Sequence, residues 1–520
     1  MNRRNFLKTA GAVSAASLMD GTASTQTKQP RQIVIILGES VRADMMNCYR
    51  QTGLRTPNLD RLASEGIRFD KAYNCQPVCA PARSAIWTGL FPHTNDVWAN
   101  SMPLGDTVHT LGQHLHDRGV HCAFVGKWHL DGVDYFGTGR PAPGWDPKYW
   151  YDMRDYLTEL SPEDRMRSRK KSTGDDPTWT AADCYGHRCT NRALDFLSKH
   201  KGEDYLLVVA YDEPHDPSLC PIEYSDSYKE FVFPGSPNIE DTLTNKPAEQ
   251  RIWAGGRLHK KQPPIQAHQF FGSHTFIDNE IGRVLDEIEK SAPNAMVLYT
   301  ADHGVFLESH HLADKGPAMY DEITKIPLIV KWPGVAPVGA VCHHVVSHID
   351  VSGTAMDYFG LGVPKTMEGT SMLATFKDPA IAPHTEIFIE WGRYEVDHDG
   401  FGAFQPIRCV YDGRYKLSIH LLTTDELYDL ETDPGEMDNL IDSAEHAAKR
   451  NELHDKLLNW MNETRDPFRG YYWGHRAWRP DFPETWSNSG MTRQRESDGY
   501  LPRELDYATG LPMKNATRPK

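Results

Sequence analysis

The stretch Gln32-Ile33-Val34-Ile35-Ile36-Leu37 decides the fold of this chain. It is an unbroken run of mainly β-branched apolar residues, which is typical of a parallel strand buried on both faces of a sheet. Similar apolar runs recur downstream, separated by stretches with helical spacing. Strands are expected at 205–210, 295–299 and 326–331, and helices at 57–65, 110–118 and 276–290. This alternation predicts an α/β fold in which helices sandwich a large sheet.

The sequence pattern changes after about residue 385. Short runs typical of antiparallel strands follow, and then one helical pattern. The strands are expected at 386–390, 407–411, 415–419 and 426–430, and the helix at about 443–462. Because the chain is longer than one usual domain, we predict a large α/β domain over 29–385 and a smaller α+β domain over 386–520.

Charge and cysteine content narrow the possible functions. Lys plus Arg number 56 against 71 Asp plus Glu, which gives a formal net charge of −15. This balance argues against a general binder of nucleic acid or of anionic membranes, and an anionic ligand needs a local positive pocket. The 9 cysteines show no CxxC pair for zinc, and their odd number leaves at least one unpaired, with Cys79 the obvious candidate.

The first residues carry a targeting signal. Asn2-Arg3-Arg4-Asn5-Phe6-Leu7-Lys8 is followed by a weakly apolar stretch over 9–19 and a small polar run over 20–27. This pattern resembles a bacterial twin-arginine export signal, predicted over 1–28; that route carries folded proteins. The apolar stretch is shorter than the roughly 20 residues of a membrane span, and no later segment approaches that length. A periplasmic or secreted protein with no stable membrane span is expected.

The most informative motif is Cys79-Ala80-Pro81-Ala82-Arg83, followed by Thr88-Gly89, which reads C-x-P-x-R-x4-T-G. It resembles the signature at which sulfatases have a cysteine oxidised to formylglycine. The resemblance implies that a formylglycine-generating or anaerobic sulfatase-maturing enzyme modifies Cys79. The hydrated aldehyde attacks sulfur with one hydroxyl and expels sulfate by elimination with the other. Arg83 is expected one turn beyond Cys79 on the same face of a helix that starts near Pro81.

Two further blocks supply proton-transfer groups. Gly126-Lys127-Trp128-His129-Leu130 is similar to the sulfatase G-K-W-H block, and Asp212-Glu213-Pro214-His215 follows an apolar strand as in that family. The resemblance implies that Lys127 binds sulfate and that His129 takes a proton from the diol. It also implies that His215 protonates the leaving alcohol and contacts the substrate. If Lys127 and His129 lie on a strand, they share one face.

The expected metal ligands follow two of the strands. Thr300-Ala-Asp-His-Gly304 resembles the metal block of sulfatases, and Leu37-Gly-Glu-Ser40 stands where they typically carry two consecutive aspartates. The resemblance implies that Glu39, Asp302 and His303 bind one divalent metal together with modified Cys79. Here Glu39 and Ser40 replace the aspartate pair, which leaves the metal's identity open. We expect calcium, with manganese as the alternative.

The resemblance adds two groups on the substrate side. Lys315 follows the metal block as the second sulfate-binding lysine, and Asn100 stands where related enzymes place an amide against the transferred group. Tyr, Trp and Arg residues in the tail at 465–520 could contact sugar rings and their charged groups, or could pack over the main domain.

Together these blocks imply an alkaline-phosphatase-like fold. It has a large mixed β-sheet between helices and a C-terminal α+β domain with a short antiparallel sheet. The resemblance makes 29–385 the catalytic sulfatase domain, and we expect hydrolysis of a sulfate monoester on a saccharide. The alternative within the same superfamily is a phosphonate monoester or phosphodiester hydrolase. A third reading is an exported binding protein without activity, which the Glu39-Ser40 departure supports.

Overall fold

The computed structural model describes residues 29–132, 134–260, 264–396, 403–482, 505–507 and 509–512. The export signal predicted over 1–28 lies outside these residues. Among the helices described, none is long and apolar enough to cross a membrane.

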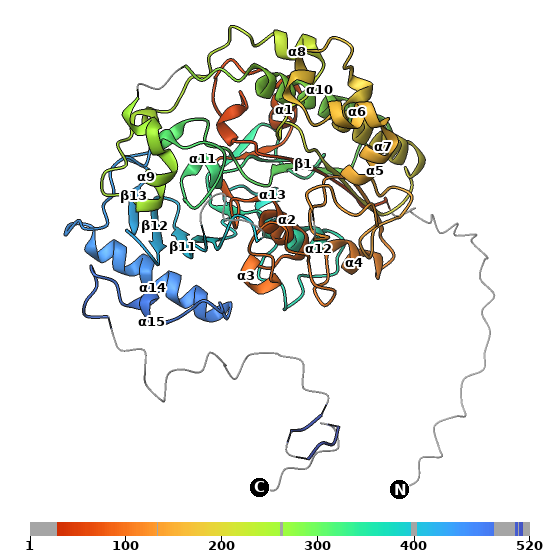
Figure 1. The fold of residues 1–520 in the computed structure, drawn as a ribbon. Helices are drawn as coiled ribbons and strands as arrows, with labels where there is room; N and C mark the ends of the chain where they lie inside the picture. The colour runs from red at the N-terminus through yellow and green to blue at the C-terminus, as the bar shows by residue number, and fades with distance from the viewer. Residues whose placement is uncertain are drawn as a thin grey trace, which may run out of the picture. The chain divides into compact units, whose positions relative to one another are not determined.

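The predicted central strand is β1 (Gln32–Gly38), all of whose residues are buried. It pairs in parallel with β5 on one side and β6 on the other, which satisfies its backbone groups along both edges. Figure 1 shows β1 between α1, α7 and α10 on one side and α2, α4 and α12 on the other. The sheet has seven strands in the order β4-β5-β1-β6-β7-β2-β8. Its other strands are β2 (Ile67–Phe69), β4 (His121–Gly126), β5 (Tyr205–Ala210), β6 (Met296–Ala301), β7 (Leu328–Lys331) and β8 (Ala340–Cys342).

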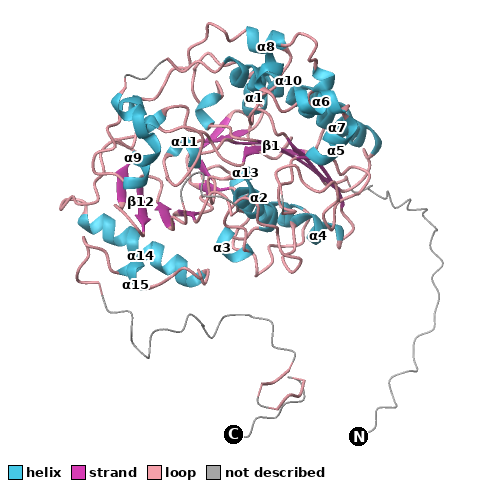
Figure 2. Cartoon of the chain, viewed as in Figure 1, coloured by secondary structure: helices cyan, strands magenta, loops and turns pink. Residues whose placement is uncertain are grey.

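The two faces of the sheet are covered by different helices (Figure 2). Ile33, Ile35 and Leu37 join an apolar core with α2 (Cys79–Thr88), α4 (Leu111–His116) and α12 (Asp350–Tyr358). Val34 and Ile36 point to the other face. They join a second core with α1 (Pro57–Ser64), α7 (Tyr185–Lys199) and α10 (His268–Ser291). The predicted α/β sandwich is therefore confirmed.

Shorter elements connect these layers. Strands β3 (Ala72–Tyr73) and β9 (Val346–Ser347) pair in parallel. The short helices are α3 (Pro92–Asn95), α5 (Met153–Glu159), α6 (Pro162–Arg167), α8 (Ile222–Asp226), α9 (Ala248–Ala254), α11 (Asp321–Thr324), α13 (Leu373–Lys377) and α15 (Tyr471–Gly474). The 3-10 helices are η1 (Ala43–Met45), η2 (Lys171–Asp175), η3 (Ala181–Asp183), η4 (Pro237–Glu240), η5 (Gly255–His259) and η6 (Ser309–His311).

The expected antiparallel sheet near the C-terminus is also present. It consists of β10 (Ile387–Trp391), β11 (Ile407–Tyr411), β12 (Tyr415–His420) and β13 (Glu426–Asp429), each antiparallel to the next. Helix α14 (Ala447–Glu463) packs against it through a shared apolar core. The boundary between 29–385 and 386–520 stays a prediction.

The described part of the tail packs on this sheet and helix. Arg476 binds Asp425 through two hydrogen bonds of 2.8 and 2.9 Å, and the indole of Trp478 donates to the same carboxylate at 2.8 Å. Arg479 lies 2.7 Å from Asp455. These side chains are thus used in packing, which favours that reading of the tail over sugar binding; Trp486 lies outside the described residues.

One strand differs from the expected pattern. The run at 326–331 was expected to behave like the central strand, but β7 begins at Leu328 and runs antiparallel to β6. Pro327 lacks the N–H that a ladder needs, and the amide of Ile326 donates to Ala72 instead. The direction of a strand depends on how the chain returns to the sheet, which the apolar pattern does not encode.

Gly126, the last residue of β4, generates a stability prediction. Its φ is +120°, and a Cβ there would lie 1.9 Å from the carbonyl oxygen of Ala210 on the neighbouring strand. We expect Gly126→Ala to lower the free energy of unfolding by about 3 kcal/mol or more, because the backbone of β4 or of β5 would have to move to make room for the added Cβ. Gly119, at φ +79° with nothing within 4 Å of the added Cβ, is the matched control. Its change to Ala should cost about 1–2 kcal/mol. Denaturant unfolding measures both, and equal losses would contradict the steric argument.

Candidate active site

The carboxyl ends of four neighbouring strands deliver polar side chains to one region. Parallel strands end at the same edge of a sheet, where ligands of α/β proteins bind. Glu39 follows β1, Lys127 follows β4, Asp212 follows β5, and Asp302 with His303 follows β6. Helix α2 adds Cys79 at its first position. The helix therefore begins at Cys79 itself rather than near Pro81 as expected, and Gly89 ends it in the left-handed conformation.

The four predicted metal ligands lie together. One donor atom from each of Glu39, Cys79, Asp302 and His303 falls within 4.8 Å of the others, and all four residues are buried. The Sγ atom of Cys79 is 3.2 Å from Oε1 of Glu39 and 3.2 Å from Nε2 of His303. The distance from that Nε2 to Oε1 of Glu39 is 3.6 Å.

Hydrogen bonds orient these donors. Nδ1 of His303 lies 2.8 Å from the carbonyl oxygen of Gly304, which can only accept, so Nδ1 carries the hydrogen and Nε2 keeps its lone pair. Oδ1 of Asp302 accepts from the amide of His303 at 2.8 Å and from that of Ser40 at 3.2 Å. The Ser40 hydroxyl donates to Glu39 Oε1 at 3.2 Å, so Ser40 supports a donor atom of the group.

Arg83 and Lys127 neutralise the carboxylates. The buried guanidinium of Arg83 binds Glu39 at 2.7 Å, Asp302 at 3.0 Å and the carbonyl oxygen of Lys127 at 2.6 Å. The ammonium of Lys127 lies 3.1 Å from Glu39 and 3.2 Å from Asp212. Lys127 and His129 do not lie on a strand, so the argument that a strand places them on one face does not apply. Both residues follow the end of β4, and His129 has a φ of +61°. The positive φ of Gly126 turns the chain out of the strand before Lys127.

The environment controls protonation in the site. Burial raises the pKa of the Cys79 thiol, and the carboxylate of Glu39 raises it further, so the unmodified thiol stays neutral. Burial, with Lys127 and Arg83 nearby, holds the pKa of His129 well below its ordinary value. Its buried Nδ1 has no hydrogen-bond partner within the described part of the chain. Burial followed by the charge of Lys127 lowers the pKa of His215.

Lys315 and Asn100, the two residues predicted to contact the substrate, both interact with the start of α2: Lys315 electrostatically with Cys79, and Asn100 with Ala80. The ammonium of Lys315 is 3.2 Å from Asp314 and 5.9 Å from the centre of the Tyr394 ring. Burial opposes its charge, but the acidic groups around it, Cys79 first, raise its pKa well above the ordinary value. The side-chain oxygen of Asn100 accepts from the amide of Ala80 at 2.9 Å, which ties Asn100 to the first turn of α2.

Two residues of the site were missed by the motifs. Tyr135 donates from its hydroxyl to Asp212. Its ring lies 4.9 Å from that of His215 and 4.4 Å from the ammonium of Lys127. Tyr135 stands in a loop with no recognisable pattern. Asp212 stood within a quoted block, but nothing in the spacing indicated that it faces Lys127.

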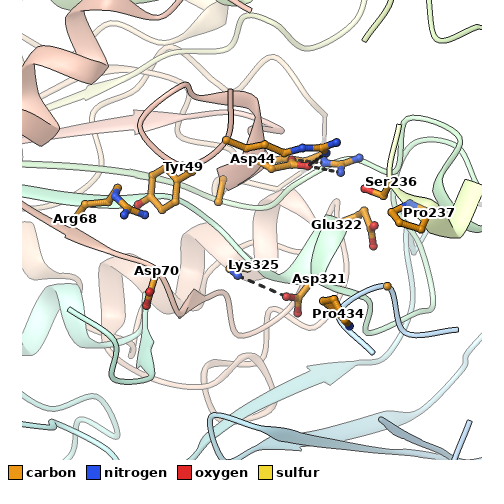
Figure 3. A pocket seen from close by; sticks show the side chains of 14 residues that line it. Asp44, Tyr49, Arg68, Asp70, Ser236, Pro237, Asp321, Glu322, Lys325 and Pro434 are labelled. Carbon is orange, nitrogen blue, oxygen red and sulfur yellow. Dashed lines mark hydrogen bonds and ion pairs between the residues drawn. The ribbon is translucent and has the colours of Figure 1, made fainter. Parts of the chain in front are cut away.

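A cavity of about 540 Å³ lies beside the loop that follows β1 (Figure 3). Arg42 binds Asp44 there through two hydrogen bonds of 2.8 Å, and Lys325 lies 3.8 Å from Asp321. None of the ten predicted site residues, all of them described, is among those that line it. The cavity is therefore separate from the group around Cys79.

Comparison with family models identifies three regions of the chain. Residues 31–361 match the model described as Sulfatase, and residues 308–463 match the one described as N-sulphoglucosamine sulphohydrolase, C-terminal. Residues 1–19 match the TAT (twin-arginine translocation) pathway signal sequence, which indicates export.

Solved structures share the fold. One in complex with D-glucosamine-2-N,6-O-disulfate has a TM-score of 0.70 at 20% identity, covering 85% of this chain and 99% of that chain. A phosphonate monoester hydrolase of Agrobacterium radiobacter has a TM-score of 0.68 at 19% identity, covering 85% and 97%. At these identities the likeness concerns the fold alone, and it agrees with the expected alkaline-phosphatase-like architecture.

Relatives in sequence are more informative. The chain is 25% identical over 544 residues to an N-acetylglucosamine-6-O-sulfatase of Bacteroides thetaiotaomicron, covering 89% of this chain and 92% of the relative. It is 40% identical over 500 residues to an uncharacterized sulfatase, YidJ, of Escherichia coli, covering 94% of this chain and 98% of the relative. With the Sulfatase model matching most of its length, the chain belongs to the sulfatase family of sulfuric ester hydrolases.

Proposed function

We propose that the protein hydrolyses a sulfate monoester on a carbohydrate, in the periplasm or outside the cell, with a nucleophile made from Cys79. The observation that carries this proposal is the position of Cys79. It opens α2, and its Sγ lies 3.2 Å from both Glu39 and His303. A thiol that is buried and neutral is a poor nucleophile, so conversion of Cys79 to formylglycine supplies the reactive group.

The four ligands fit a divalent cation. Their donor atoms converge from buried side chains, and Nε2 of His303 has its lone pair turned toward the group. Glu39, Asp302, His303 and modified Cys79 would hold the ion, which when bound supplies a Lewis acid beside the reacting oxygen. We expect calcium because three of the four ligands, the two carboxylates and modified Cys79, would offer oxygen; the imidazole makes manganese the alternative.

Residues of the chain then move two protons. One deprotonated hydroxyl of the hydrated aldehyde bonds to sulfur while the bond from sulfur to the alcohol oxygen breaks. The anionic sulfate ester favours the protonated form of His215, whose pKa is lowered in the free site, and His215 then gives that oxygen its proton. Lys127 and Lys315 offset the charge of the sulfate. The second hydroxyl loses its proton to His129 and becomes the aldehyde oxygen, while the bond from carbon to the sulfate oxygen breaks and sulfate leaves. A neutral His129 suits this role, because its depressed pKa keeps it able to accept a proton.

Relatives support a sugar as the alcohol. Besides the N-acetylglucosamine-6-O-sulfatase, a Delta 4,5-hexuronate-2-O-sulfatase of Bacteroides thetaiotaomicron is 24% identical to this chain over 478 residues. The described arginines of the tail add no support, since Arg476 and Arg479 already bind aspartates. The rival assignment, a phosphonate monoester or phosphodiester hydrolase, rests on Glu39-Ser40 in place of two aspartates. Turnover of phosphonates or phosphodiesters with no turnover across a panel of sulfated saccharides would favour it.

We predict that active protein carries formylglycine at position 79. Peptide mass analysis should find the aldehyde there, and Cys79→Ala should abolish sulfate release, because the nucleophile is gone. Cys75→Ala is the matched control, since Cys75 is also buried and lies four residues upstream. It should keep the modification and turnover per folded molecule. Active protein with only unmodified cysteine at 79 would refute the mechanism.

We predict that Asp302→Asn lowers both metal content and catalysis. The change removes one negative charge from the ligand group, so kcat/KM for a sulfate ester should fall by about 100-fold or more. Asp278→Asn is the control: Asp278 is equally buried but accepts hydrogen bonds from the start of α1. It should leave metal content and kcat unchanged. Full metal occupancy in Asp302→Asn, measured by elemental analysis, would remove Asp302 from the ligand set.

We predict that His215→Ala has an effect that depends on the leaving group. Turnover of a sugar sulfate should fall by about 100-fold or more, because a sugar alkoxide leaves poorly without a proton. Turnover of nitrophenyl sulfate should fall by about 10-fold at most, since nitrophenolate needs little protonation. His129→Ala is the comparison, because its step follows departure of the alcohol and should not discriminate between the substrates. Equal losses in His215→Ala would make His215 a sulfate-binding residue instead.

A further inference from the structure

A second cluster of ligating side chains lies at the opposite end of the sheet. It comprises His121, the first residue of β4, His200 at the end of α7, and Glu203 in the loop before β5. Donor atoms of these three residues lie within 4.8 Å of one another. Because β4 runs from His121 to Gly126, the cluster is about 20 Å from Lys127. It is therefore independent of the chemistry at Cys79.

The two histidines share one carboxylate. Nδ1 of His121 lies 2.9 Å from Oε2 of Glu203, and Nδ1 of His200 lies 2.9 Å from Oε1. The imidazole rings are perpendicular, at 89°, with their centres 4.6 Å apart. Both Nδ1 atoms thus converge on Glu203 from different segments of the chain.

The outer nitrogens have partners of their own. Nε2 of His121 lies 2.7 Å from Oδ2 of Asp146, and Nε2 of His200 lies 3.2 Å from the hydroxyl of Tyr149. A carboxylate or hydroxyl behind a histidine fixes the ring and leaves the other nitrogen free for a metal. His121 faces carboxylate oxygens on both sides, and these oxygens only accept. A cation between Nδ1 of His121 and Glu203 would satisfy both groups.

The backbone holds the segments in place. The amide of His121 donates to the carbonyl oxygen of Asp204 at 3.0 Å, and that of Asp146 donates to Cys122 at 2.8 Å. Side-chain exposure is 24% for His121, 16% for His200 and 48% for Glu203, so solvent can reach the cluster and complete a coordination shell. The arrangement is preorganised and open on one side.

We propose that His121, His200 and Glu203 bind one transition-metal ion of the zinc class. Two imidazole nitrogens and one carboxylate are the ligands that zinc takes, with water in the fourth position, whereas calcium and magnesium prefer oxygen ligands throughout. The ion would connect the start of β4 to the α7–β5 loop and so stabilise the folded chain.

Zinc binding to the chelator-treated full chain tests this site. The site around Cys79 can also bind zinc. The measured quantity is therefore the difference in bound zinc per chain between wild type and each variant, obtained by equilibrium dialysis with elemental analysis. His200→Gln and Glu203→Gln should each lose one zinc ion per chain, or bind it at least about 10-fold more weakly. Added zinc should raise Tm in wild type and shift it less in both variants; calcium should not replace zinc at this site.

His343→Gln is the matched control. His343 is an exposed histidine 2.5 Å from Asp70, and within the described part of the chain this pair belongs to no group of three ligands. It should bind as much zinc as wild type. Glu203 is half-exposed, so Glu203→Gln should fold even if His200→Gln does not. Wild-type zinc content and affinity in folded Glu203→Gln, or an equal loss in His343→Gln, would overturn the proposal and leave an ordinary ion pair.

Discussion

The contact between Arg83 and the two carboxylates of Glu39 and Asp302 is the interaction on which the rest of the site depends. All three side chains are fully buried. Two carboxylates within one dry pocket repel each other, and removal of a buried partner leaves a charge that costs several kcal/mol. Arg83 supplies the opposite charge from α2, and it also binds the carbonyl oxygen after β4. One guanidinium thus connects the ends of β1, β4 and β6 to the helix that carries Cys79.

Local sequence patterns correctly predicted those features of the fold that depend mainly on neighbouring residues. The apolar runs correctly predicted β1 and β5, because a strand that is buried on both faces consists almost entirely of apolar residues. The pairing of strands depends on the route of the chain between them, so the antiparallel direction of β7 could not be read from its residues. The helix α2 begins two residues earlier than expected, because Pro81 is tolerated within a first turn, whose N–H groups have no partner inside the helix.

The candidate site, too, could be predicted only in part from local sequence patterns. The residues of the matching motifs lie together, because strand ends converge at one edge of the sheet. Tyr135 was missed, since its contacts with Asp212 and His215 join loops that follow different strands. The arginines of the tail are a different case, because composition alone did not decide their role. Their composition left sugar contact and packing both open, and Arg476 binds Asp425, which lies 51 residues earlier in the chain.

Cys79 is only 1% exposed in the folded protein, and this burial limits when another enzyme can reach it. Another enzyme cannot bind this segment as an extended peptide once it has folded into α2 and packed against the face of the sheet. The proposed conversion of Cys79 therefore requires the segment before it folds, while it is still extended. This order is compatible with the twin-arginine signal, because that export route carries folded proteins. Under the proposed mechanism, a molecule that folds before Cys79 is modified keeps a buried, unmodified thiol and stays inactive.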